Sequence, residues 1–250
     1  METLADGIAV YQGDYRDAGV TACDHIITDP PYEDELHNAM GRDKDRFRND
    51  GGPVSGELGF IGINSQRAEI ARDIVNVSNG WTLAFSLAEG VRAWRDDLQA
   101  AGAKWDTTLA WIKPDSRPRF NGQGPARGFE CICVVWCGKG YRSWNGGGKR
   151  GIYTHLTNGA SRHGLHPTEK PLSLMCELLI DFTKPGDLIF DPFMGSGTTG
   201  LACIKLGRKF IGCEIDPAYY QAAKERMSAA LDQTDMFTPI PERLKQGRLI

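Results

Sequence analysis

A glycine-rich turn between two apolar runs near the C-terminus limits the folds open to this chain more than any other feature. The run 187–191 (DLIFD) precedes the turn, and the run 201–206 (LACIKL) follows it. This pattern is typical of a buried strand that enters a helix through a tight turn. Glycine lets the backbone approach a ligand, and the first N–H groups of a helix lack partners within it. The segment therefore predicts an α/β fold with a ligand site at the turn.

Strand-like and helix-like segments alternate along the chain. Strands are predicted near 7–12, 23–28, 81–86, 106–112, 130–136, 187–190 and 209–213, and helices near 65–78, 89–101, 171–183, 198–206 and 216–231. This alternation is typical of a mostly parallel sheet with helices on both faces. The two strands between 106 and 136 predict an antiparallel hairpin. The 250 residues (1–250) are expected to form a single domain.

The glycines of the turn also match the GxGxxG pattern of dinucleotide sites, through Gly195, Gly197 and Gly200. The next predicted strand ends at Glu214, and an acid at that position suits the hydroxyls of a ribose. Both features fit NAD. They fit S-adenosylmethionine (SAM) equally, because SAM carries a ribose but no pyrophosphate. A nicotinamide-dependent oxidoreductase is therefore one interpretation of the turn.

The surroundings of the turn favour SAM. Asp191 and Phe193 lie around its first glycine, where a carboxylate would repel a pyrophosphate. The ammonium group in the methionine part of SAM would instead be attracted to this carboxylate. A dinucleotide site also usually opens its chain, whereas this turn lies near the C-terminus.

The tetrapeptide Asp29-Pro30-Pro31-Tyr32 directly follows the apolar run 25–28. Neither proline has an N–H and both have a fixed φ, so the Pro30 carbonyl is free to act as an acceptor beside the Asp29 carboxylate. Tyr32 offers a flat face for stacking. Two acceptors and a ring suit a planar base that carries an exocyclic amino group, such as adenine or cytosine. Taken alone, the tetrapeptide could also be a strand-ending turn.

The motifs and their order resemble the amino-group DNA methyltransferases, in the permuted arrangement of the β-class. The matching stretches are Gly13-Asp14, 26–32 (IITDPPY), 166–171 (HPTEKP), 191–199 (DPFMGSGTT) and 212–216 (GCEID). The resemblance is weak for 34–60 and 113–163. Several motifs in the same order are far more specific than any one of them.

The resemblance implies a Rossmann-like SAM-dependent methyltransferase fold, with SAM as the cofactor. It implies that Asp29, Pro30, Pro31 and Tyr32 receive the target base, which must flip out of the duplex to reach them. By the same resemblance, the cofactor-binding residues are Asp14, Thr168, Lys170, Asp191, Phe193, Gly195, Ser196, Gly197, Thr198 and Glu214. Glu214 is expected at the ribose, and Thr168 and Lys170 are expected at the methionine end.

The residue before the two prolines bears on the choice of base. Family members that act on adenine N6 commonly carry Asp or Asn there, and those that act on cytosine N4 more often carry Ser. Asp29 therefore favours adenine N6, with cytosine-N4 and RNA adenine methyltransferases as alternatives. A homodimer and a cognate restriction endonuclease are further expectations from the resemblance.

Charge is distributed unevenly along the chain, whose formal net charge is −3. Residues 113–163 hold nine basic and two acidic side chains, so this segment carries +7 and the remainder −10. A basic segment on an acidic body suits a contact surface for double-stranded DNA. We predict that 113–163 is the target-recognition region and that 33–60 is a mobile loop. The candidate DNA contacts are Arg117, Arg119, Arg127, Arg142, Lys149 and Arg150.

The seven cysteines lie mostly in apolar strands and helices, which predicts reduced thiols in a cytoplasmic protein. Cys131, Cys133 and Cys137 have the wrong spacing for a zinc site, so no metal is predicted. No apolar run reaches the roughly eighteen residues of a membrane span. The N-terminus also lacks a signal-peptide pattern.

Overall fold

A computed structural model describes residues 1–31, 65–116, 124–157 and 169–236 of the chain. Its strands are β1 (Glu2–Ala5), β2 (Ile8–Gln12), β3 (His25–Thr28), β4 (Trp81–Ser86), β5 (Lys104–Ile112), β6 (Phe129–Trp136), β7 (Ile152–Thr154), β8 (Leu188–Asp191) and β9 (Lys209–Glu214). Its helices are the 3-10 helix η1 (Tyr15–Ala18) and the α-helices α2 (Arg67–Val77), α3 (Val91–Ala100), α4 (Leu172–Phe182), α5 (Thr198–Leu206) and α6 (Pro217–Met236).

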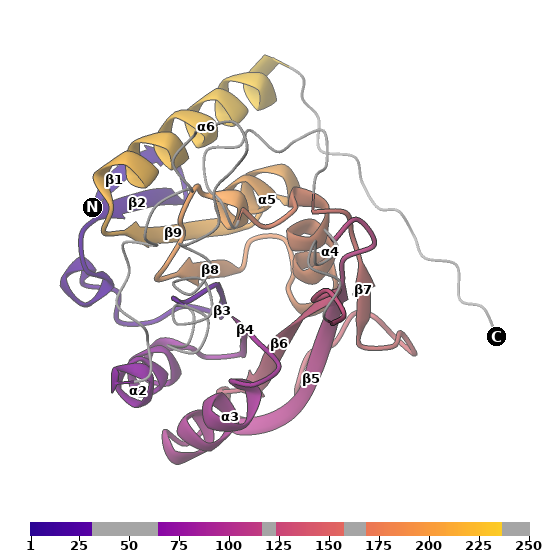
Figure 1. The fold of residues 1–250 in the computed structure, drawn as a ribbon. Coiled ribbons are helices and arrows are strands. Elements are labelled where there is room, and N and C mark those ends of the chain that lie inside the picture. The colour runs from indigo at the N-terminus through magenta and orange to yellow at the C-terminus, as the bar shows by residue number, and fades with distance from the viewer. Residues whose placement is uncertain (32–64, 117–123, 158–168, 237–250) are drawn as a thin grey trace, which may run out of the picture.

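The described strands form one sheet in the order β1-β2-β9-β8-β3-β4-β6-β5-β7 (Figure 1). The pairs β2–β9, β9–β8, β8–β3, β3–β4 and β5–β7 are parallel, whereas β1–β2, β4–β6 and β6–β5 are antiparallel. The mostly parallel sheet and the antiparallel β5–β6 pair are as predicted. The short strands β1 and β7, at the two edges of the sheet, were not predicted.

The core has two layers, one on each face of the sheet. In one layer, α4, α5 and α6 cover the sheet, and Leu178 and Met227 belong to the same buried cluster as Phe210 of β9. In the other, α2 and α3 cover the opposite face, and Ile74 and Leu98 belong to a cluster with strand residues. A strand that is buried on both faces carries a nearly continuous run of apolar residues. This is why β3 and β4 were recognisable in the sequence.

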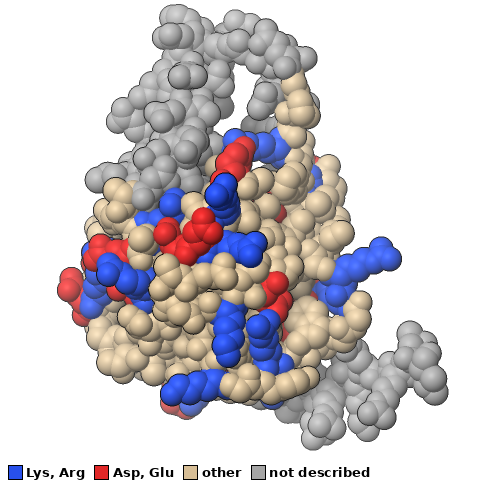
Figure 2. Space-filling view, turned by 90° about the horizontal axis from the view of Figure 1, so that it is seen from below, with Lys and Arg blue, Asp and Glu red and all other residues tan. Residues whose placement is uncertain are grey.

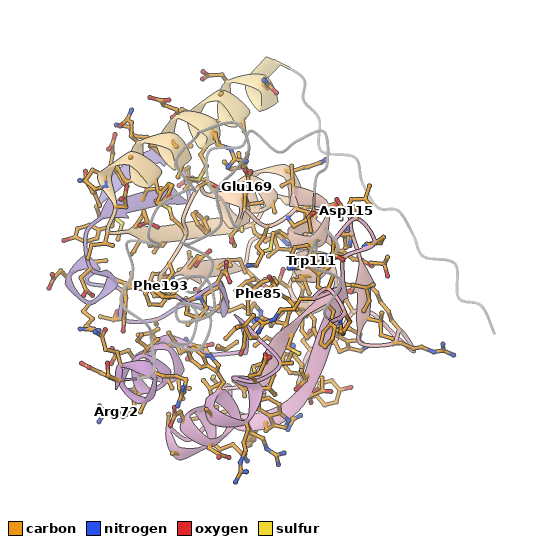
Figure 3. The ribbon with its side chains drawn as sticks, viewed as in Figure 1. Arg72, Phe85, Trp111, Asp115, Glu169 and Phe193 are labelled. Atoms are coloured by element: carbon orange, nitrogen blue, oxygen red, sulfur yellow. The ribbon has the colours of Figure 1, made fainter. Side chains whose placement is uncertain are left out.

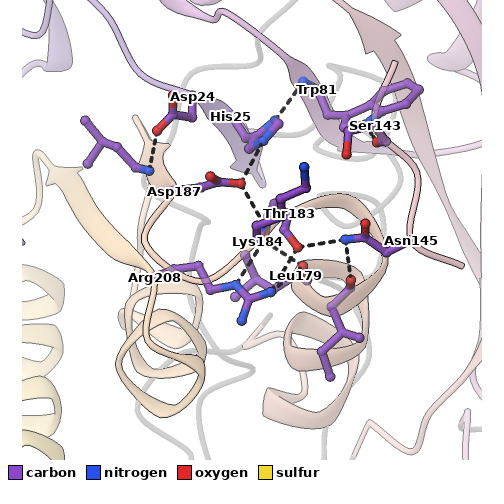
Figure 4. A network of polar contacts seen from close by, with 12 residues as sticks. Asp24, His25, Trp81, Ser143, Asn145, Leu179, Thr183, Lys184, Asp187 and Arg208 are labelled. Atoms are coloured by element: carbon purple, nitrogen blue, oxygen red, sulfur yellow. Dashed lines mark hydrogen bonds and ion pairs between the residues drawn. The ribbon is translucent and has the colours of Figure 1, made fainter. Parts of the chain in front are cut away.

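A polar network closes the amino ends of the central strands (Figure 4). His25 Nδ1 accepts a hydrogen bond from the Trp81 amide at 2.9 Å, and His25 Nε2 lies 3.2 Å from Asp187 Oδ2. Asp24 Oδ2 accepts from the Leu188 amide at 2.7 Å. Burial lowers the pKa of His25, although the nearby Asp187 opposes that shift. These contacts join the starts of β3, β4 and β8 and leave the other edge of the sheet for a site.

The carboxyl edge of the sheet gathers residues that are distant in sequence. β3, β8 and β9 are parallel, so Asp29, which follows β3, lies at the same edge as Asp191 and Glu214, which end β8 and β9. Ser86 at the end of β4 pairs with Cys131 of antiparallel β6, so Glu130 reaches this edge too. Ile112 at the end of β5 pairs with Phe129, which brings Lys113 to the same place.

All seven cysteines are free, and the described residues contain no group of His, Cys, Asp and Glu that could hold a metal ion. None of the described helices is long and apolar enough to cross a membrane.

Candidate active site

Asp29 stands at the centre of the carboxyl edge, immediately after β3. Its Oδ2 accepts a hydrogen bond from Lys170 Nζ at 2.6 Å. Its Oδ1 is buried and has no hydrogen-bond donor among the described residues. Burial raises the pKa of Asp29, and the Lys170 ammonium opposes that rise. A buried carboxylate oxygen without a partner is costly, so this atom is suited to a donor that a ligand brings.

Glu130 extends the ionic contacts away from Asp29. Its Oε2 lies 3.3 Å from Lys170 Nζ, and its Oε1 accepts from Lys113 Nζ at 2.5 Å. Burial acts to raise the pKa of Glu130, but the two ammonium groups outweigh it and the pKa is lowered. The two lysines also lie over aromatic rings that Figure 3 labels: Lys170 Nζ is 4.9 Å from the centre of Phe85, and Lys113 Nζ is 4.4 Å from that of Trp111.

Asp191 is buried, and both oxygens of its carboxylate accept hydrogen bonds from the protein. Its Oδ1 accepts from the Thr28 hydroxyl at 2.8 Å and from the Phe193 amide at 3.2 Å. Its Oδ2 accepts from the Thr199 hydroxyl at 2.7 Å. Burial raises the pKa of Asp191 to about 7, although these hydrogen bonds favour the ionised form. The carboxyl group therefore joins β3, β8 and the start of α5.

Replacing Asp191 by asparagine should make the free energy of unfolding less dependent on pH. Because the pKa of the folded form is raised to about 7, the folded protein keeps a proton that the unfolded chain releases near pH 4. The wild type therefore loses stability as the pH rises across this window, by up to about 4 kcal/mol from this group. Denaturant titrations of both proteins at pH 5 and pH 8 measure the difference. Equal losses in the two proteins would contradict the assignment.

The turn between β8 and α5 depends on glycine at two positions. Gly195 has φ 51° and Gly197 has φ 80°, the left-handed region that residues with a side chain rarely adopt. A Cβ on Gly197 would also lie 2.9 Å from the Ala223 Cβ of α6. The third glycine of the pattern, Gly200, faces Met227 and Phe210, and a Cβ there would lie 2.8 Å from the Phe210 ring. Gly200 thus serves the packing of α5 on the sheet.

Glu214 holds the same turn from β9. Its Oε2 accepts from the Gly195 amide at 2.9 Å, and its Oε1 accepts from the Asp216 amide at 2.9 Å. Burial raises the pKa of Glu214, and the two amide donors oppose the rise. The Glu214 carbonyl accepts from the Gly13 amide at 2.9 Å, which brings the end of β2 beside this acid.

Two further predicted cofactor residues lie next to that contact. Asp14 follows Gly13 and caps η1, where its Oδ1 accepts from the Arg16 amide at 3.0 Å. Phe193 packs edge-on against Tyr15, with ring centres 5.3 Å apart (Figure 3 labels Phe193). The structure therefore brings the start of η1 and the glycine turn together at one end of the carboxyl edge.

Ser196 and Thr198 lie in the turn and at the start of α5, and both are buried. The Ser196 carbonyl accepts from Arg226 Nη1 at 2.6 Å, and Arg226 Nη2 forms an ion pair with Glu169 at 2.6 Å. The Thr198 hydroxyl is buried without a hydrogen-bond partner among the described residues. The Glu169–Arg226 pair fixes the residue next to Lys170 against the glycine turn, a contact that the sequence analysis missed.

Sequence reasoning also missed Glu130 and Lys113, although a signal for them existed. Lys113 directly follows the predicted strand 106–112, and Glu130 begins the predicted strand 130–136. In an antiparallel hairpin, the end of one strand and the start of the next lie at the same edge. Tyr32 and Thr168, and the whole predicted loop 33–60, lie outside the described residues.

Of the four described basic side chains that were predicted to contact DNA, three are paired with acids. Arg127 forms an ion pair with Glu89 at 3.2 Å, and Arg142 pairs with Asp106. Figure 2 shows basic and acidic side chains interleaved on one face of the molecule. Arg117 and Arg119 lie outside the described residues.

Lys149 is held between α4 and the segment before β7. It pairs with Glu177 at 2.6 Å and also with Asp181. Burial acts to lower the pKa of Lys149, but the hydrogen bonds to these acids outweigh it and raise the pKa. The neighbouring Arg150 is exposed and forms no ion pair with a described residue. Of the described basic candidates, Arg150 is thus the one best placed to meet a phosphate.

The sequence of this chain also matches those of known proteins. Residues 23–225 match the family model N6_N4_Mtase, described as DNA methylase. The chain is 27% identical over 224 residues to the Type II methyltransferase M2.DpnII of Streptococcus pneumoniae, covering 82% of each protein. Over 223 residues, it is also 27% identical to the Type II methyltransferase M2.LlaDCHI of Lactococcus lactis subsp. cremoris, again covering 82% of each.

Solved structures share the fold. The crystal structure of an M1.HpyAVI–SAM complex aligns with a TM-score of 0.68 and 26% identity, over 88% of this chain and 98% of the other. The cytosine-N4-specific PvuII DNA methyltransferase aligns with a TM-score of 0.62 and 16% identity, over 90% and 91% of the two chains. The buried Thr198 hydroxyl, the left-handed glycines and the acid at the end of β9 suit a ligand with SAM's ribose and amino groups.

Proposed function

This chain belongs to the N6/N4 family of DNA methylases, and we propose that its acceptor is the exocyclic N6 of an adenine in double-stranded DNA. Site-specific methylation of a base amino group with SAM as the methyl donor is the activity of this family. The Rossmann-like fold and the SAM cofactor inferred from the sequence are thereby confirmed. The choice of adenine over cytosine and the roles of single residues are parts of the proposal.

The observation that carries the proposal is the pair of oxygens on Asp29. Oδ2 is bound by Lys170, whereas Oδ1 is buried without a donor among the described residues. An amino group of the target base would supply that donor, with the Pro30 carbonyl as the second acceptor. Asp at the position before the two prolines supports adenine N6, since family members that act on cytosine N4 more often carry Ser there.

An exocyclic amine is a weak nucleophile because its lone pair is delocalised into the ring. When bound, SAM supplies a methyl group on a sulfonium, which departs as a neutral thioether. Asp29 Oδ1 and the Pro30 carbonyl draw the two N–H groups toward them, so the nitrogen becomes more tetrahedral and its lone pair faces the methyl carbon. Asp29 Oδ1 then accepts the proton that the methylated nitrogen releases. Most of the acceleration arises from holding nitrogen and methyl in contact.

The target base must leave the duplex to reach Asp29, because this oxygen is enclosed at the edge of the sheet. Tyr32 is proposed to stack on the flipped base. Arg150 is proposed as a phosphate contact, since it is exposed and, unlike the exposed Arg127, forms no ion pair with a described residue. Because of such phosphate contacts, the affinity for DNA should fall as the salt concentration rises.

The proposed cofactor site lies between η1 and the glycine turn. Phe193, Gly195 and Glu214 are proposed to contact SAM, with Glu214 at the ribose hydroxyls and Asp14 near the adenine ring. Asp191 is proposed to shape the turn through the three hydrogen bonds that its carboxylate accepts from Thr28, Phe193 and Thr199. Ser196, Gly197 and Thr198 complete the site, with Thr168 closing over the methionine end.

A homodimer and a cognate restriction endonuclease remain part of the proposal. The names of the two curated relatives, both Type II methyltransferases, support a role in restriction and modification. Light scattering of the purified protein with and without duplex DNA measures the oligomeric state. A monomer under both conditions would contradict the dimer.

Expression in a host without DNA methylation of its own tests the choice of base. Mass analysis of nucleosides from the host DNA should detect N6-methyladenine with the wild type and not with the Asp29→Ala variant. N4-methylcytosine in place of N6-methyladenine would contradict the adenine assignment and keep the family. Methylated RNA with unmodified DNA would favour an RNA methyltransferase instead.

A further inference from the structure

Four charged side chains of alternating sign form a continuous chain that starts at Asp29. Lys170 Nζ bonds Asp29 Oδ2 at 2.6 Å and lies 3.3 Å from Glu130 Oε2, and Lys113 Nζ bonds Glu130 Oε1 at 2.5 Å. The residues come from four separate places: the end of β3, the segment before α4, the start of β6 and the end of β5. Lys170 and Glu130 expose only 6% and 10% of their side chains.

The contacts among these four side chains must offset the large free-energy cost of burying their charges. An ionised carboxylate taken out of water is strongly disfavoured unless it is paired and hydrogen-bonded. Lys170 pairs with two acids, and Lys113 supplies the second positive charge, so the four side chains together are neutral. The Glu169–Arg226 ion pair at 2.6 Å fixes the residue before Lys170 and so limits where the lysine can reach.

From this geometry we propose that Lys170 is a positioning residue, which holds Asp29 through Oδ2 and thereby leaves Oδ1 facing the target amine. Glu130 and Lys113 hold the Lys170 ammonium in place. This inference rests on the proposed function, in which Asp29 Oδ1 receives the amine. The sequence-based expectation placed Lys170 at the methionine end of SAM, and in the structure its ammonium lies on the carboxylates of Asp29 and Glu130.

The proposal predicts opposite effects for the two neighbours of Asp29. The charged groups that act on Asp29 are Lys170 before α4, Glu130 on β6, Lys113 after β5 and Asp191 at the end of β8. Lys170 lowers the pKa of Asp29, so its loss should raise that pKa further. Glu130 raises the pKa of Asp29, so removal of its charge should lower it.

The experiment compares Lys170→Met and Glu130→Gln with the wild type, and uses Lys205→Met as the matched control. Lys205 is an exposed lysine on α5. The pKa of Asp29 is measured by carbon NMR of labelled aspartate carboxyl groups in the protein without SAM or DNA. The Asp29 resonance is identified as the one missing from an Asp29→Asn variant. The methyl-transfer rate in a single turnover is measured over the same pH range.

Lys170→Met should shift the pKa of Asp29 upward by about one to three units, and Glu130→Gln should shift it downward. Because the amine needs the ionised carboxylate, the rate falls as the pH drops through this pKa. The acid limb of the rate profile should therefore move to higher pH in Lys170→Met, with about a tenfold loss of rate per unit below the limb. It should move to lower pH in Glu130→Gln, and stay in place in Lys205→Met.

An unchanged Asp29 pKa in folded Lys170→Met would overturn the proposal, and so would shifts of the same sign in both variants. A purely structural role for Lys170 would lower stability and leave the pH profile where it is. If Lys170→Met fails to fold, the downward shift in Glu130→Gln remains the deciding result. Failure of the proposed function is recognised separately, as a wild type that transfers no methyl group to DNA, because the NMR titration needs neither SAM nor DNA.

Discussion

Replacement of Asp29 by alanine should lower the rate of methyl transfer about a thousandfold while SAM binds as tightly as to the wild type. The variant loses the oxygen that accepts the amine hydrogen bond, and loss of one preorganised partner of a reacting group typically costs about a hundred- to a thousandfold. It also leaves Lys170 without its carboxylate partner at 2.6 Å. SAM affinity should be retained because, among the described cofactor candidates, only Lys170 forms a hydrogen bond or ion pair with Asp29.

Single-turnover transfer of a labelled methyl group measures the rate, and calorimetry measures the dissociation constant of SAM. Asp96→Ala is the matched control, since Asp96 is an exposed aspartate on α3 whose one ion pair among the described residues, with Arg92, is 3.8 Å long. That variant should transfer at the wild-type rate. A rate for Asp29→Ala within tenfold of the wild type would remove Asp29 from the mechanism.

Replacement of Glu214 by alanine should raise the dissociation constant of SAM about ten- to a hundredfold. The proposed ribose contact would be lost, and a hydrogen bond to a charged group contributes about 1.5–3 kcal/mol. The glycine turn would also lose the acceptor that fixes the Gly195 amide at 2.9 Å. Transfer at saturating SAM should fall less than binding does, because Glu214 does not contact Asp29.

Binding of SAM to Glu214→Ala is compared with binding to Glu225→Ala. Glu225 is an exposed glutamate on α6 that bonds only Gln221 among its described contacts. Thermal unfolding of both variants shows whether the turn keeps its structure. An unchanged dissociation constant in folded Glu214→Ala would exclude the ribose contact.

The parts of the site that follow single strands were predictable from the sequence. Asp29, Asp191 and Glu214 each end an apolar run, and parallel strands bring such ends to one edge. The glycine turn was predictable for a similar reason, because Gly195 and Gly197 adopt a backbone conformation that other residues avoid. Local rules therefore located most of the carboxyl edge.

The partners of these residues were not predictable, because they depend on contacts between distant segments. Lys170 lies 141 positions from the Asp29 that it binds. Its motif placed it near SAM by resemblance, and only the tertiary fold brings the segment before α4 to two carboxylates. Likewise, the excess of basic residues in 113–163 did not reveal that Lys149 pairs with Glu177 and Asp181. Composition gives the charge of a segment but not its pairing.

The most direct test is a structure of the protein with a duplex that contains its methylation site and a non-reactive analogue of SAM. We expect an adenine outside the helix, with its N6 within about 2.6–3.2 Å of Asp29 Oδ1. We also expect N6 to lie about 3–3.5 Å from the position of the transferable methyl group. A flipped base whose amine bonds neither Asp29 Oδ1 nor the Pro30 carbonyl would contradict the account.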